Sequence, residues 1–172
     1  MKKWWIILTV LIILIIVIIG FVYYEMNSPF QLNGVNIPNN INTLTKTSQE
    51  TIDGYLVVKG GENIIKNCYV VSYNPDSSLN NIQICKPKIS PESAINNLIN
   101  IQLDFNDKSG IKYSKEDIKI NGVTVRTFTY DPSNCGNPGY CTHYYWKQGS
   151  IIFNTETRSI AENYIDSNKG LF

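Results

Sequence analysis

The sequence predicts an α+β fold, in which an N-terminal transmembrane helix precedes an antiparallel β-sheet of about seven strands covered by two helices. Three observations support this prediction. An apolar run lies close to the N-terminus, short β-branched runs are separated by turn dipeptides, and two later segments carry apolar residues at helical spacing. Strands joined by short turns are antiparallel, so the hairpins belong to one antiparallel sheet.

The N-terminal run has the length of a membrane-spanning helix. No residue is charged from Ile6 to Tyr23, and a helix of that length spans about 27 Å, close to the hydrocarbon thickness of a bilayer. Because Lys2 and Lys3 are the only flanking basic residues, we expect a cytoplasmic N-terminus and a C-terminal domain outside the cell. Aromatic residues flank the run on both sides, as in interfacial belts: Trp4, Trp5, Tyr23 and Tyr24.

The chain therefore divides into three parts. We expect residues 1–24 to hold the cytoplasmic Lys-Lys pair and a single-pass signal anchor in the cell membrane. Residues 25–34 are expected to form a stalk, and residues 35–172 an extracytoplasmic α+β domain. A cleaved signal peptide is the alternative. The long apolar run and the lack of a small-x-small cleavage pattern favour the uncleaved anchor.

The charge balance restricts the partners. The chain has 15 basic and 14 acidic residues, and without Lys2 and Lys3 the outer part keeps 13 basic residues. Nucleic acids and anionic membrane surfaces select for a basic face, so neither is expected as the main partner. We expect the membrane, through the N-terminal helix, and another membrane or envelope protein as partners, and no cofactor.

The first half of the outer part predicts hairpins. A polar connection is expected over residues 39–51, and a two-residue turn at Gly60-Gly61 would pair Val57 with Ile64. Both faces of this first hairpin carry apolar residues, which indicates a sheet covered by a helix on each side. Strands are expected near residues 33–38, 55–59, 62–73 and 81–86.

The hairpin after this one brings two cysteines together. If the turn at NPDSSL is symmetric, Val70 faces Gln83 and Cys68 faces Cys85. A shift of one residue would place the two sulfurs on opposite faces of the sheet. The alignment therefore favours a cross-strand disulfide.

Two segments predict helices. In SPESAINNLINIQ, Ser90 is the expected N-cap and Pro91 the first helical residue, followed by a polar stretch through Gly110. The segment TRSIAENYIDSNKG is expected to end at Gly170. The apolar stripes are Ala94, Ile95, Leu98 and Ile101 in the first helix, and Ile160, Ala161, Tyr164 and Ile165 in the second.

Two more hairpins are expected in the second half. The first, on Asn121-Gly122, would set Asp117 opposite Arg126 as an exposed ion pair. The second would turn at Gln148-Gly149. The residues expected to share one face are Ile118, Ile120, Val123 and Val125 in the first of these hairpins, and Tyr144, Trp146, Ile151 and Phe153 in the second.

This order of elements resembles the PsbP-like domain. The resemblance covers residues 33–168 and rests on topology, on SPESAINNL, on NGVTVRTFTY and on the I-x-G-x-x turn from Ile120 to Thr124. It implies an accessory or adaptor domain on a membrane surface and no enzymatic activity. The paired cysteines and the metal or partner sites of that family do not map onto this chain residue by residue.

A second pair of cysteines precedes the only histidine. Cys135 and Cys141 are spaced C-x5-C across a Gly- and Pro-containing bend, and His143 follows. Outside the cell an even number of cysteines favours disulfides, here Cys68–Cys85 and Cys135–Cys141. A metal site formed by Cys135, Cys141 and His143 is the alternative, although a fourth ligand is not evident.

The aromatic residues around this loop allow two interpretations. They are either sheet core beneath a helix or part of a binding surface displayed on a loop that the disulfide makes rigid. The candidate binding surface consists of Asp131, Asn134, Asn137, Tyr140, His143 and Tyr145.

We therefore expect a membrane-anchored, extracytoplasmic accessory or binding domain without enzymatic activity. A metal-dependent or hydrolytic envelope enzyme that uses His143 is one alternative. A structural cell-surface component is the other.

Overall fold

The computed structural model of the chain consists of two compact units, Met1–Gln31 and Leu32–Phe172. In the first unit, residues 10–20 are helical and their large apolar side chains are exposed. Among the described residues, no helix combines the length and the apolar character that crossing a membrane requires. The predicted anchor also includes residues 5–9 and 21–24, which lie outside the described residues. The structure describes Trp4 and residues 10–20, 34–53, 61–74, 80–131, 133 and 141–170.

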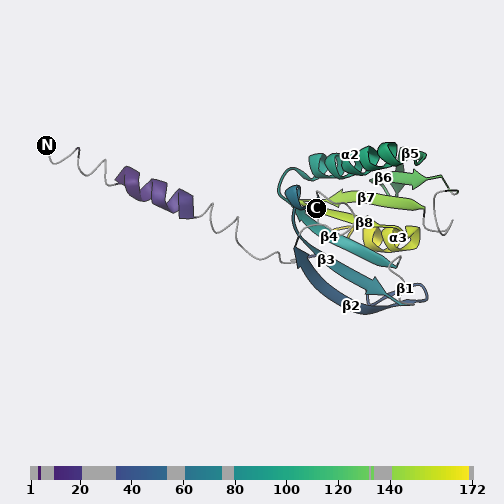
Figure 1. The fold of residues 1–172 in the computed structure, drawn as a ribbon. Helices are drawn as coiled ribbons and strands as arrows, with labels where there is room; N and C mark the ends of the chain where they lie inside the picture. Colours follow the sequence, from purple (N-terminus) through teal and green to yellow (C-terminus); the bar gives the residue numbers. More distant parts are fainter. Residues whose placement is uncertain are drawn as a thin grey trace. The chain divides into compact units, whose positions relative to one another are not determined.

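The second unit contains one eight-stranded antiparallel sheet, which confirms the predicted α+β class. The strand order is β1-β2-β3-β4-β8-β7-β6-β5, and every neighbouring pair is antiparallel (Figure 1). The strands are β1 (Asn40–Ile41), β2 (Leu44–Asp53), β3 (Ile65–Tyr73), β4 (Asn81–Pro87), β5 (Tyr113–Ile120), β6 (Val123–Tyr130), β7 (Thr142–Gln148) and β8 (Ile151–Thr155).

Two helices pack on opposite faces of the sheet. The helix α2 (Pro91–Ser109) connects β4 to the far edge strand β5, and α3 (Arg158–Ser167) follows β8. Because side chains alternate along a strand, β7 contributes to both helix interfaces, with Tyr145 on one face and Trp146 on the other. The core beneath α2 contains Ile64, Ile65, Cys68, Cys85, Ala94, Ile95, Leu98, Ile99, Phe128, Tyr145 and Ile152.

The core beneath α3 is aromatic. The ring of Trp146 stacks on Phe153 with centroids 5.0 Å apart, and Phe153 lies against Tyr164 of α3. The Tyr164 hydroxyl lies 2.8 Å from the Tyr73 hydroxyl, which donates to the carbonyl of Pro38. The side of α3 that was predicted to be apolar is the buried one, although the helix ends at Ser167, before the predicted stop.

The helix α2 is longer than predicted. Its N-cap is confirmed, because the Ser90 hydroxyl accepts a hydrogen bond from the backbone N–H of Ser93. The helix continues through the predicted polar stretch to Ser109, and Gly110 ends it with a left-handed φ of 69°. This stretch is helical because Gln102 and Asn106 extend the buried face with polar side chains, which a search for apolar periodicity overlooks.

The N-terminal strands differ from the prediction. Residues 35–38 are not in a strand, and the expected polar connection forms β1 and most of β2 around a turn at Asn42-Thr43. The β2 side chains from Thr47 to Thr51 are exposed, so this strand has no apolar alternation by which it could be recognised.

The expected partner of Ile64 lies outside the described residues, as does the whole predicted strand over 55–59. Ile64 itself follows the short helix η1 (Gly61–Asn63) as a turn residue and belongs to no strand. The strand that pairs with β3 on this side is β2, which lies earlier in the chain; Thr51 of β2 pairs with Tyr69 of β3.

The other hairpins agree closely with the prediction. Asn121 and Gly122 have positive φ values, and Asp117 faces Arg126 as expected. The last turn lies one residue later than predicted, at Gly149-Ser150, because Gln148 pairs with Ile151. When a two-residue turn moves by one position, each residue pairs with one two positions further along the other strand. Because side chains alternate with a period of two, the same residues stay on the same face, and the predicted aromatic face is preserved.

Candidate functional site

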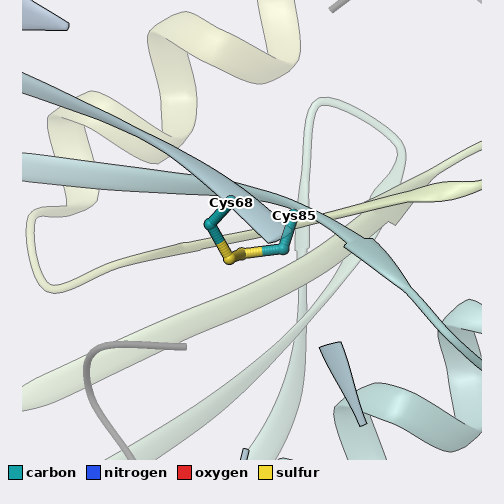
Figure 2. The surroundings of a disulfide bond; sticks show 2 residues. All are labelled: Cys68 and Cys85. Atoms are coloured by element: carbon teal, nitrogen blue, oxygen red, sulfur yellow. A yellow bond between two sulfur atoms is a disulfide. The ribbon is translucent and has the colours of Figure 1, made fainter. Parts of the chain in front are cut away.

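A disulfide joins the neighbouring strands β3 and β4 of the sheet. Cys68 of β3 lies directly opposite Cys85 of β4, and their sulfur atoms are bonded (Figure 2). The two residues are 0% and 1% exposed. This confirms the pairing predicted from the register and gives the bond a structural position in the core beneath α2.

Cys141, immediately before β7, is also disulfide-bonded. Its predicted partner Cys135 lies outside the described residues, so the pairing Cys135–Cys141 stays a prediction. A cysteine in a disulfide does not supply the thiolate that a zinc site requires. In the described part of the chain, no group of three or more His, Cys, Asp or Glu side chains is placed to hold a metal ion.

The predicted binding surface is described only in part. The Asp131 carboxylate accepts hydrogen bonds from the hydroxyl and the backbone N–H of Ser133, at 2.6 and 2.9 Å. These bonds lower the pKa of Asp131 and fix the start of the loop. Asn134, Asn137 and Tyr140 lie outside the described residues.

His143 and Tyr145 are buried beneath α2 and are not displayed. They are 5% and 1% exposed. Both lie on the same face of β7, and α2 covers that face, so the displayed arrangement expected for Tyr145 is wrong. The interpretation of these residues as sheet core beneath a helix is the one that the structure agrees with.

His143 has an aromatic environment. Its ring centroid lies 5.6 Å from that of Tyr130, 6.2 Å from Tyr145 and 6.5 Å from Phe128. Burial lowers the pKa of His143 to about 4, so the imidazole is neutral at neutral pH. Its Nδ1 atom makes no hydrogen bond to a described residue and lies 3.7 Å from Oε1 of Glu156. Burial also raises the pKa of Glu156.

Gln102 of α2 links the two tyrosines of this cluster, a role that was not predicted. The Tyr145 hydroxyl donates to Oε1 of Gln102 at 3.0 Å, and Nε2 of Gln102 donates to the Tyr130 hydroxyl. Gln102 lies four residues after Leu98, on the helical stripe that the sequence already defines. Continuing the 3.6-residue spacing to a polar residue would have found it.

Arg126 of β6 occupies the groove between α2 and β5. Its Nε and Nη2 atoms donate to the two carboxylate oxygens of Asp117 at 2.9 and 3.2 Å. On the other side Nη1 lies 3.3 Å from Oε1 of Glu92 and donates to Asn96. The hydrogen bonds from Arg126 lower the pKa of Asp117. The cross-strand pair was predicted, but its connection to α2 was not.

Arg126 separates two hollows of this groove. The inner hollow has a volume of about 310 Å³ and lies between Asn96 and Asn100 of α2 and Lys115 of β5. The outer hollow, about 290 Å³, lies between Glu92 of α2 and Lys147 of β7. Asp117 and Arg126 line both. We call the two hollows together the α2–β5 groove.

The comparisons with known proteins add no family. No family model, no curated protein and no solved structure matches the chain. The resemblance to the PsbP-like domain therefore stays a prediction from the order of elements.

Proposed function

We propose that this chain is a single-pass membrane protein that presents an accessory or binding domain outside the cytoplasm. The apolar surface of the helical residues 10–20 carries the proposal. Every residue from Val10 to Ile19 is apolar and exposed, between 46% and 62%. A helix that is apolar on all sides requires an apolar environment, which a lipid bilayer supplies.

The disulfide supports the extracytoplasmic placement of the domain. Cys68 and Cys85 are bonded within the core of the domain, and disulfides persist in oxidising compartments outside the cytoplasm. The Lys2-Lys3 pair before the apolar run favours the same orientation through the positive-inside rule.

The open α2–β5 groove supports a binding role. One wall of the groove is the helix α2 and the other is formed by strands, and both carry charged or amide side chains. Polar groups held on rigid elements are suited to ligand recognition. The enzyme alternative has less support, because His143 is buried and Cys141 is disulfide-bonded. A structural surface component remains the other alternative, and self-association of the chain would favour it.

Membrane placement is tested with the full chain in a bacterial host with an oxidising periplasm. We expect the protein to remain in the membrane pellet after alkaline carbonate extraction, and external protease to digest its C-terminal domain. A variant with Ile13→Lys and Ile16→Lys should be lost from the pellet, whereas Ile13→Leu with Ile16→Leu should behave like the parent. Release of the parent by carbonate, with free thiols at Cys68 and Cys85, would refute the proposal.

A substitution at His143 separates binding from metal-dependent chemistry. The full chain and its His143→Phe variant are compared by native mass spectrometry. If His143 holds a catalytic ion, the parent should carry a divalent metal that the variant lacks. For a binding module, we expect the two proteins to differ only by the mass of the substitution.

A further inference from the structure

The strand β5 is an edge of the sheet. It pairs with β6 on one side, and on the other side it has no strand among the residues that the structure describes. The backbone N–H of Asp131 donates to the carbonyl of Lys112, which continues the register of the β5–β6 hairpin. The even-numbered residues of β5 therefore bond β6, because these bonds recur at every second residue. The backbone groups of Lys115, Asp117 and Lys119 point away from the sheet.

The free edge of β5 is accessible and charged. The side chains from Ser114 to Asp117 and that of Lys119 are exposed, and Ile118 between them is partly buried. Asp117 keeps 48% of its side-chain surface exposed although it binds Arg126, so it can contact a second cation. Unpaired backbone groups along such an edge are a template for pairing with a further strand.

The charges on β5 allow two copies of the strand to pair in one central register. When two identical strands pair antiparallel about a twofold axis, one residue faces its own copy. In this position Lys115, Glu116, Asp117 or Lys119 would face a like charge, which is destabilising. Ile118 is the one residue of this stretch without a charge. If Ile118 faces its copy, Asp117 of each strand faces Lys119 of the other.

We propose that β5 pairs antiparallel with β5 of a second copy of this chain, with Ile118 facing Ile118 across the twofold axis. Asp117 of each copy forms an ion pair with Lys119 of the other, and the outward backbone groups of these residues bond the two strands. The sheets of the two copies then continue into one another. This pairing goes beyond the proposed function, which requires only one copy.

The second copy extends a row of charges that the chain already forms. Arg126 lies opposite Asp117 and donates to its carboxylate, and Lys119 lies opposite Thr124 and donates to its hydroxyl. Lys119 of the second copy would lie on the free side of Asp117, so this carboxylate would have a cation on each side. Cross-strand pairs of opposite charge stabilise strand pairing.

The opposite edge of the sheet does not offer the same pairing. After its first residues, which pair with β1, the strand β2 carries Glu50 and Asp53 and no basic residue from Thr47 onward. Two copies of this part of β2 form no ion pair in any register. We therefore expect the assembly to close at two copies, unlike the extended array that a structural surface component would form.

Disulfide trapping of the full chain in detergent micelles tests the register. The variant Ile118→Cys places two cysteines opposite each other at a position that exchanges no backbone hydrogen bonds, and Cys68 and Cys85 are bonded at a position of the same kind. All described cysteines of the parent are in disulfides, so none competes.

The control for the register is Glu116→Cys, on the same face of β5. In the proposed pair the two copies of Glu116 lie four residues apart along the strands, too far for a disulfide. We expect Ile118→Cys to give about tenfold more disulfide-linked dimer on non-reducing gels than Glu116→Cys. Equal crosslinking of the two variants would overturn the proposal.

Charge reversal tests the ion pairs in the Ile118→Cys background. Lys119→Glu places a carboxylate opposite Asp117 of the other copy and should reduce crosslinking about tenfold. Lys112→Glu makes the same charge change before β5 begins, outside the paired stretch, and should leave crosslinking unchanged. Equal effects of the two reversals would overturn the proposal. So would the absence of any crosslinked dimer, which would leave the edge for a strand of another protein.

Discussion

His143 and Glu156 lie side by side at the end of the β7–β8 hairpin, with Nδ1 of the imidazole 3.7 Å from Oε1 of the carboxylate. His143 is almost completely buried, and among the described residues the other titratable groups beside it are the hydroxyls of Tyr130 and Tyr145. Burial disfavours the charged form of both partners, so their pKa values move toward each other. A buried histidine of this kind makes folding sensitive to acid.

We predict that the free energy of unfolding falls as the pH drops below about 6.5. Burial lowers the pKa of His143 from 6.5 to about 4 in the folded chain. Between these values the unfolded chain binds a proton that the folded chain does not. Stability is therefore lost toward low pH, by up to about 3 kcal/mol over the window. The raised pKa of Glu156 offsets part of this loss at the acidic end.

The measurement is urea unfolding from pH 7.5 to 4.5 for the parent and the His143→Phe variant. His143 is the only histidine in the chain, so the variant should lose the slope between pH 6.5 and 5. An unchanged slope in the variant would contradict the assignment to His143.

Loss of the Cys68–Cys85 bond should destabilise the domain by about 3 kcal/mol. The bond closes a loop with a sequence separation of 17, and the chain-entropy model attributes about that amount to a loop of this size. We would compare urea unfolding of the parent with a variant carrying Cys68→Ala and Cys85→Ala. In this variant, any further loss of stability on adding reductant comes from the disulfide of Cys141 alone. A free energy of unfolding within about 0.5 kcal/mol of the parent's would exclude a stabilising role.

The Tyr73 hydroxyl should contribute more to stability than the Tyr164 hydroxyl. The Tyr73 hydroxyl donates to the Pro38 carbonyl and is also bonded to the Tyr164 hydroxyl, whereas the Tyr164 hydroxyl bonds only Tyr73 among the residues that the structure describes. Tyr164→Phe should cost about 1 kcal/mol. Tyr73→Phe removes the hydrogen bonds of the buried Tyr164 hydroxyl and the half-buried Pro38 carbonyl and should cost about 2 kcal/mol. Thermal unfolding of both variants decides the order, and the reverse order would contradict this network.

Gln102 should be coupled energetically to Tyr145. Gln102→Leu removes the hydrogen bonds from the Tyr145 hydroxyl and to the Tyr130 hydroxyl, and the loss of a buried hydrogen bond costs about 1 kcal/mol. Adding Tyr145→Phe then costs less than in the parent, because its bond to Gln102 is already absent. The double variant should therefore be less destabilised than the sum of the single variants. Additive losses in a double-mutant cycle would show that the two side chains act independently.

Local sequence patterns were sufficient to predict an element wherever its turn residues or the alternation of its apolar side chains defined it. Asn121-Gly122 placed Asp117 opposite Arg126, and the spacing around NPDSSL placed Cys68 opposite Cys85. These predictions succeeded because a short turn determines the register of the strands it joins. The N-cap at Ser90 was equally local.

Elements without an apolar pattern could not be predicted in this way. The strand β2 is polar, and its hydrogen bonds to β3 and, at its start, to the two-residue strand β1 give it strand geometry. The second half of α2 is helical because Gln102 and Asn106 are buried against the sheet as polar residues. In both cases the tertiary structure supplies the partner, and local propensity does not identify it.

By itself, the sequence determined the antiparallel α+β class, the hairpin registers and the facing of Cys68 and Cys85, because each follows from interactions a few residues apart. Only the tertiary structure decided that His143 and Tyr145 are buried and that Arg126 separates two hollows. These features require α2 to lie across strands that are distant in the sequence. That contact depends on long-range packing, which no local pattern encodes.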